Sequence, residues 1–184
     1  MAAALTVLCT AAAPAADAAP AAATETLTCT VNAAVAFSPP LSAQAPPTTV
    51  TIGGTAGTCL DSQTGDSTIV SGTVSATLKF TALSCNPATP AVLAQGSTAA
   101  FTWNLKDGGQ ATSTLTGIAI TQVDGAGTLT ATVTDGSTRL ASEKLTALLN
   151  IDSDQPILDN CIDVLLGTGT PITNSTLTAE TAFA

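Results

Sequence analysis

The chain has 184 residues and a formal net charge of −9; 45% of its residues are apolar, but only 3% are aromatic and 9% charged. Four Lys and Arg residues against 13 acids cannot build a basic patch, which excludes nucleic acid and anionic membrane surfaces as expected partners. Because the sequence contains no His and no Tyr, the usual nucleophile–base pairs cannot be assembled, and we expect a protein that is not an enzyme.

Residues 1–24 form an alanine-rich stretch whose apolar part is too short to span a bilayer. The stretch is typical of a secretory signal peptide, and its small residues predict cleavage after Ala18. No Lys or Arg precedes Lys79, so the basic start of such a signal would lie upstream of Met1. We expect the remaining residues, 25–184, to form a single domain.

Cys9 offers an alternative to cleavage, because a lipoprotein anchor could be attached to it. The residue before an acylated cysteine is expected to be small, and here it is Leu8. We therefore expect a secreted, extracellular protein with no membrane insertion after signal removal.

Strands are predicted from apolar residues that recur at every second position. In the first strand, residues 25–37, one face carries Leu27, Cys29, Val31, Ala33, Val35 and Phe37. Similar alternation predicts strands over residues 48–59, 68–85, 97–105, 110–123, 127–137 and 175–183. Residues 145–151 and 163–167 are apolar without alternation, which fits either a strand buried on both faces or a short helix.

Glycines interrupt these strands at three places. Gly53-Gly54 predicts a bulge or bend, and Asp107-Gly108 predicts a hairpin turn of the primed type. The apolar alternation of the strand after that turn changes frame near Gly117. The chain holds 35 threonines, and Thr-X-Thr runs are typical of the outward faces of half-exposed strands.

Eight or nine short antiparallel strands, with a turn signal every ten to fifteen residues, predict an all-β fold. We expect an immunoglobulin-like β-sandwich, with a barrel as the alternative. A parallel α/β fold is excluded, because no ten-residue helical pattern separates the strands.

The cysteines predict two disulfides. Once Cys9 is removed with the signal, four of the five cysteines remain, and an even number in an exported chain implies disulfide pairing. If strands 25–37 and 48–59 form a hairpin in which Val35 faces Ile52, Cys29 lies beside Thr58. A one-residue bulge, at Gly53, Gly54 or Gly57, would then bring Cys59 opposite Cys29. We therefore predict Cys29–Cys59 and, by elimination, Cys85–Cys161.

Two weak candidate sites remain. Asp152, Asp154 and Asp159 cluster in an acidic segment and supply the oxygen ligands that calcium prefers, but their spacing matches no EF-hand loop. We expect a solvated loop there, with no metal and no cofactor, and calcium as the alternative. Trp103, the only tryptophan, would be a stacking platform for a sugar if exposed, but an aromatic-poor chain favours burying it in the core.

Several motifs in order resemble those of small exported Thr/Gly-rich β-sandwich proteins of actinobacteria, a group of uncharacterised function. They are C-x-V-x-x-x-V-x-F-S-P-P-L, GTAGTC, SGTVSATLKFTALSC and FTWNLKDGGQATSTL, followed by a late NC. The resemblance implies export and a β-sandwich, and it transfers no catalytic or binding residues.

We expect a non-enzymatic secreted or cell-surface protein that acts as a structural or interaction module, with a cell-envelope glycan or protein as partner. The alternative is a carbohydrate- or calcium-dependent ligand-binding module that uses Trp103 or the loop aspartates.

Overall fold

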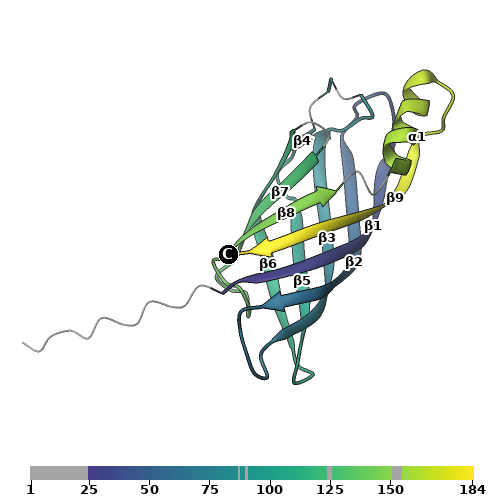
Figure 1. Cartoon of the computed structure of the whole chain (residues 1–184). Coiled ribbons are helices and arrows are strands. Elements are labelled where there is room, and N and C mark those ends of the chain that lie inside the picture. The colour runs from purple at the N-terminus through teal and green to yellow at the C-terminus, as the bar shows by residue number, and fades with distance from the viewer. Residues whose placement is uncertain (1–24, 87, 90, 124–125, 151–154) are drawn as a thin grey trace, which may run out of the picture.

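Nine strands and one short helix make up the described part of the chain, which comprises residues 25–86, 88–89, 91–123, 126–150 and 155–184 of a computed structural model (Figure 1). The predicted signal peptide and the alternative of a lipid anchor at Cys9 concern residues outside the described ones, and both stay untested. The elements are β1 (Leu27–Leu41), β2 (Thr48–Asp61), β3 (Ile69–Ala82), β4 (Val92–Leu93), β5 (Thr98–Leu105), β6 (Gln110–Val123), β7 (Ala126–Val133), β8 (Lys144–Asn150), α1 (Gln155–Leu166) and β9 (Ile172–Phe183).

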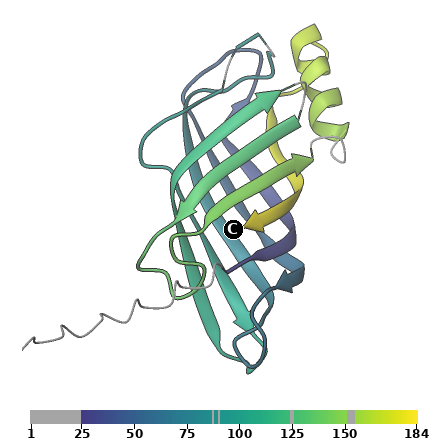
Figure 2. The same cartoon turned by 60° about the vertical axis from the view of Figure 1, so that its left-hand side comes forward.

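The strands form one antiparallel sheet that closes on itself. Their order is β2-β1-β9-β8-β7-β6-β5-β3-β4, and β2 also pairs with β3. Leaving aside the two-residue β4, each of the other eight strands has a strand on both sides, and they surround a common interior (Figures 1 and 2). The expected immunoglobulin-like sandwich is therefore corrected to a closed barrel, because a sandwich requires two sheets and the β2–β3 pairing joins the ends of one.

The alternation of the sequence separates the inside of the barrel from its outside. In β1, Leu27, Cys29, Val31, Ala33 and Val35 are buried, whereas most residues between them are exposed. Each of the eight barrel strands contributes one buried alanine, and these are Ala33, Ala56, Ala76, Ala99, Ala111, Ala131, Ala147 and Ala179. Small side chains suit the narrow interior of an eight-stranded barrel, which side chains alone can fill.

The predicted hairpin between the first two strands is confirmed. Val35 pairs with Ile52, and the register shifts by one residue between Thr28 and Thr30. The shift is at Thr58, whose φ of 48° is left-handed, and not at the glycines considered from the sequence. Gly53 and Gly54 pair regularly with β1 and form no bulge.

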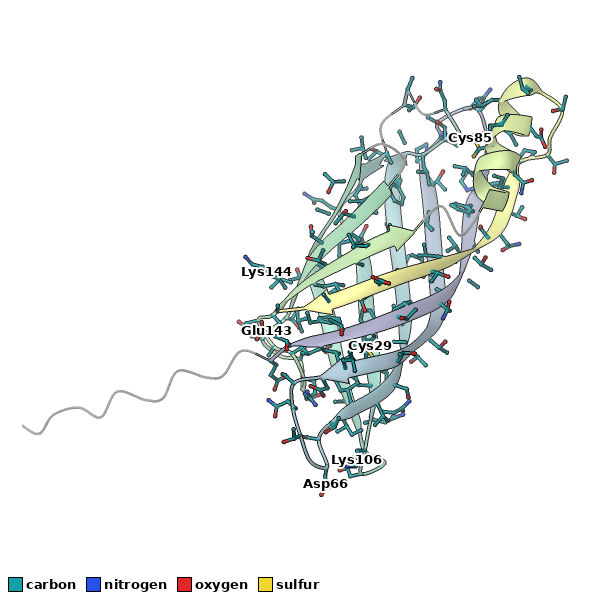
Figure 3. The ribbon with its side chains drawn as sticks, viewed as in Figure 1. Cys29, Asp66, Cys85, Lys106, Glu143 and Lys144 are labelled. Atoms are coloured by element: carbon teal, nitrogen blue, oxygen red, sulfur yellow. A yellow bond between two sulfur atoms is a disulfide. The ribbon has the colours of Figure 1, made fainter. Side chains whose placement is uncertain are left out.

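Both disulfides join the predicted partners. Cys29 is bonded to Cys59, and Cys85 is bonded to Cys161. The first lies between the neighbouring strands β1 and β2, and the second lies at the end of the barrel beside α1, which we call the helix end (Figure 3).

Local predictions for the later segments have mixed outcomes. The frame change is confirmed, because Gly117 has a φ of 62° and the β6–β7 register shifts between Thr116 and Ala119. The turn at Asp107-Gly108 is not of the primed type, because only Gly108 has a positive φ (85°), whereas a type I′ turn needs it at both residues. Residues 145–150 are in strand β8, and residues 163–166 end helix α1.

Three of the five aromatic residues, Phe101, Trp103 and Phe183, gather inside the barrel. The rings of Phe101 and Trp103 stack with centroids 4.7 Å apart, and Phe183 meets both edge-on. Trp103 is fully buried. Its indole Nε1 donates to Ser113 Oγ at 2.8 Å, and that hydroxyl donates to the carbonyl of Arg139 at 2.8 Å. The indole therefore has a partner for its only polar atom.

Candidate binding groove

The candidates raised by the sequence do not provide a site in the described structure. Trp103 is fully buried in the aromatic core, so the interpretation of an exposed sugar platform is wrong. Asp152 and Asp154 lie outside the described residues. Asp159 is in helix α1, a correction to the expected loop, but its side chain is outside the described part. Among described residues no group of three His, Cys, Asp or Glu could hold a metal ion. Two of the three candidate aspartates lie outside those residues, so the expected absence of a metal and the calcium alternative both stay untested.

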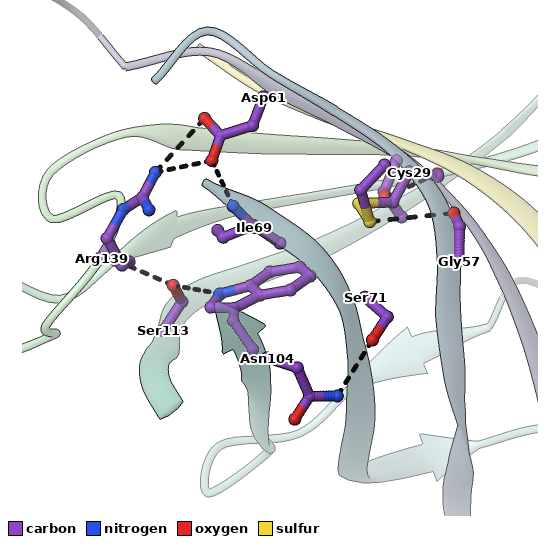
Figure 4. Close-up of a disulfide and its surroundings, with 11 residues drawn as sticks. Cys29, Gly57, Asp61, Ile69, Ser71, Asn104, Ser113 and Arg139 are labelled. Carbon is purple, nitrogen blue, oxygen red and sulfur yellow. Dashed lines mark hydrogen bonds and ion pairs between the residues drawn. A yellow bond between two sulfur atoms is a disulfide. The ribbon is translucent and has the colours of Figure 1, made fainter. Parts of the chain in front are cut away.

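An ionic cluster of Glu25, Asp61 and Arg139 occupies the barrel end opposite α1. Arg139 Nη2 donates to Asp61 Oδ2 at 3.0 Å, and its Nε donates to Glu25 Oε2 at 3.2 Å. The side chain of Asp61 is 0% exposed and that of Arg139 is 8% exposed. Figure 4 shows Arg139 linking Asp61 to Ser113 beside the indole.

Every carboxylate oxygen of this cluster already has a donor. Asp61 accepts the N–H groups of Ile69 and Gln63 besides the arginine. Glu25 accepts the N–H of Leu140 at Oε2 and the side-chain amide of Gln63 at Oε1. Arg139 Nη1 also donates to the carbonyl of Ser67. Because these bonds leave no carboxylate oxygen free for a substrate, the cluster has a structural role: it connects the start of the domain to two loops.

A shallow hollow lies on the outer wall, over β8, β9, β1 and β2. We call it the outer groove; it encloses about 400 Å³. Two ranks of paired residues run across these strands. The first rank is Leu148, Glu180 and Thr30, and the second is Thr146, Ala182, Thr28 and Leu60.

The strand period places these side chains on the outer wall. In β9, Ala179, Thr181 and Phe183 are buried, so Glu180 and Ala182 between them face out. Thr181 turns its hydroxyl to the carbonyl of Cys29 at 2.9 Å. The methyl group of Ala182 is the smallest side chain of its rank, which leaves the hollow between its neighbours on β8 and β1.

Two leucines stand at opposite corners of the outer groove. Leu60 is 74% exposed and Leu148 is 54% exposed. Among the described strand residues, the other large apolar side chains with comparable exposure are Val70 and Val92, neither of which lines the groove. Two exposed leucines therefore border one hollow, at its opposite corners, in a wall otherwise rich in threonine.

Glu180 supplies the charge of the outer groove. Its side chain is exposed on the outer wall, and the ion pairs found among the described residues are those of Arg139 with Glu25 and Asp61. No residue lining the groove is basic or aromatic. The groove thus offers an acid, threonine hydroxyls and two aliphatic side chains.

Sequence reasoning did not identify the outer groove, although a signal for its leucines was present. Leu148 is apolar at an outward position, between the inward residues Ala147 and Leu149, and this made residues 145–151 look non-alternating. Leu60 is likewise apolar and exposed, directly after Cys59. The strand order that unites them, with β9 inserted between β1 and β8, has no local signal.

Comparison with protein-family models, with curated proteins and with solved structures finds no match to this chain. No helix among the described residues is long and apolar enough to cross a membrane. The two disulfides indicate an oxidising setting.

Proposed function

We propose that the protein is an exported, non-enzymatic interaction module that binds an extended segment of a partner protein in the outer groove. The observation that carries this proposal is the convergence of the exposed Leu60 and Leu148 on one hollow of the outer wall. Export rests on the two disulfides together with the signal-like residues 1–24.

The chemistry of the groove supports binding rather than catalysis. The cysteine that lines it, Cys29, is held in a disulfide, and the hydroxyl of Thr181 is bonded to a backbone carbonyl. No aromatic side chain lines the groove, and sugar-binding surfaces commonly stack on aromatic rings, so the groove suits a peptide better than a glycan.

Photo-crosslinking tests the proposal. A benzoylphenylalanine replaces Thr28 inside the groove or, as control, the exposed Ala34 on the same strand outside it. Both proteins are irradiated with the producer's envelope proteins. We expect adducts from position 28 that disappear with Ala182→Trp, which fills the hollow, and persist with Ala34→Trp. Adducts formed equally from both positions and unaffected by Ala182→Trp would refute the proposal.

A glycan array, run with and without calcium, separates this proposal from the carbohydrate- or calcium-dependent alternative. We expect no glycan binding in either condition. Binding that requires calcium, or that survives Ala182→Trp, would favour the alternative.

A further inference from the structure

Glu180 lies at the centre of the first rank of the outer groove, with Leu148 opposite it on β8 and Thr30 opposite it on β1. Directly paired residues on one face have Cβ atoms about 5 Å apart. An atom that contacts the carboxylate therefore also lies within reach of the leucine. The site combines a negative charge with an aliphatic surface at one point.

The bases of the chain do not neutralise this acid. Arg139 is engaged with Glu25 and Asp61. Lys79, Lys106 and Lys144 do not line the groove, and no described salt bridge involves Glu180. Because the whole molecule carries a net charge of −9, a cationic ligand is also attracted at long range.

The dimensions of the groove fit a short extended peptide. Four neighbouring strands span three spacings of about 4.8 Å, or about 14 Å, which is the length of about four extended residues. The side chains of Thr28, Thr30 and Thr146 line the groove, and threonine hydroxyls can bond the amides of such a backbone. Leu60 at the far corner provides a second aliphatic contact.

We propose that the outer groove recognises an extended peptide segment in which a Lys or Arg is flanked by aliphatic side chains. The base pairs with Glu180, its aliphatic neighbours contact Leu148 and Leu60, and Ala182 leaves room for the backbone. This inference rests on the proposed function, since it names the class of partner segment that the groove binds.

A phage-displayed library of linear heptapeptides tests the inference. Phage are selected on the wild-type protein after depletion on Ala182→Trp, and enriched sequences are synthesised. Their affinities are measured for the wild type, Glu180→Gln, Ala182→Trp and Ala34→Trp. All three positions are exposed on the outer wall, so we expect the variants to keep the fold. Far-UV circular dichroism of each variant verifies this.

We expect enriched peptides to contain Lys or Arg between aliphatic residues. Because an exposed ion pair contributes up to about 1 kcal/mol, Glu180→Gln should weaken binding by about threefold to fivefold. Replacing the peptide's base by Gln should cause the same loss, with no further loss when both changes are combined. High salt should weaken wild-type binding more than binding to Glu180→Gln, which keeps only the long-range attraction of the net charge. Ala34→Trp should bind as the wild type does.

Two results would overturn the inference, and only the second would also overturn the proposed function. Neutral peptides that are blocked by Ala182→Trp but insensitive to Glu180→Gln would refute the ligand class while leaving the groove as a peptide site. A selection that yields no peptide sensitive to Ala182→Trp would refute both the ligand class and the proposed function.

Discussion

Gly72 lies on the inner face of β3 where the indole of Trp103 crosses it. A Cβ atom at this position would lie 2.6 Å from a ring carbon of Trp103 and 2.9 Å from the carbonyl oxygen of Thr102. A side chain at position 72 would therefore clash with the indole and with the backbone of β5, and only glycine fits without a shift. By contrast, a Cβ atom at Gly53 on β2 would meet nothing within 4 Å.

We predict that Gly72→Ala lowers the free energy of unfolding by about 1–3 kcal/mol, because the added methyl group overpacks the aromatic core. Gly53→Ala should raise the free energy of unfolding by at most about 0.5–1 kcal/mol, because alanine is favoured over glycine within a strand. Urea denaturation followed by the fluorescence of Trp103 measures both. Equal effects of the two substitutions would contradict this account of Gly72.

Arg139 compensates a carboxylate that has no contact with solvent. Arg139→Met should lower the free energy of unfolding by about 3–5 kcal/mol, because it leaves the charge of Asp61 buried without its counter-ion. The double variant Arg139→Met/Asp61→Asn should be less destabilised than the single one. Urea denaturation provides the measurement, with the exposed Lys106→Met as control. If Arg139→Met is as stable as Lys106→Met, Arg139 does not compensate the charge of Asp61.

At the scale of elements, α1 is attached to the barrel mainly through one small cluster. Cys85, Leu41 and Ile172 form its buried part, and Val164 and Cys161 of the helix pack against it. Ile162, Leu165 and Leu166 of the helix remain exposed. The Cys85–Cys161 disulfide thus holds a helix whose described side chains, those of residues 160–166, make few other contacts with the barrel.

We predict different local effects for the two disulfides. Removing either pair with alanines should lower the free energy of unfolding by about 3–5 kcal/mol on the chain-entropy estimate. Only Cys85→Ala/Cys161→Ala should also accelerate hydrogen exchange in residues 162–166 while the barrel amides stay protected. Hydrogen exchange monitored by mass spectrometry tests this. Faster exchange across the strands, or an unchanged helix, would contradict the expected independence of α1.

At the scale of the whole molecule, closure gives every barrel strand two neighbours. NOEs should therefore connect residues 52 and 76 across β2–β3 as well as residues 31 and 179 across β1–β9, since both pairs are in register. A sandwich would lack one of these connections and would expose an edge strand whose outward amides exchange quickly. NMR of the isotope-labelled protein distinguishes the two architectures.

The sequence predicted the features that depend on local pattern. The alternation of Leu27, Cys29 and Val31 located β1 and its buried face, and the register of the first hairpin selected the Cys29–Cys59 bond. The burial of Trp103 followed from the scarcity of aromatic residues. Helix α1 was weakly signalled, because its apolar residues do not alternate.

Other features depend on partners far away in the chain. Arg139 meets Asp61 and Glu25 across separations of 78 and 114 residues, and no spacing rule links these positions. The outer groove likewise unites Leu60 with Leu148 only because β9 lies between β1 and β8. The binding-site candidates chosen by residue type, such as Trp103, therefore differ from the residues that the fold brings together in the outer groove.

The sequence by itself determined that this chain forms antiparallel strands with one apolar face each and two specific disulfides. A period of two and the register of a hairpin are properties of neighbouring residues. Only the tertiary structure decided that the strands close into one barrel, that an arginine network occupies one end, and that a groove forms on the outer wall. The same alternation serves a sandwich and a barrel equally well, and the choice between them lies in the long-range β1–β9 pairing, which joins the first and last strands of the chain.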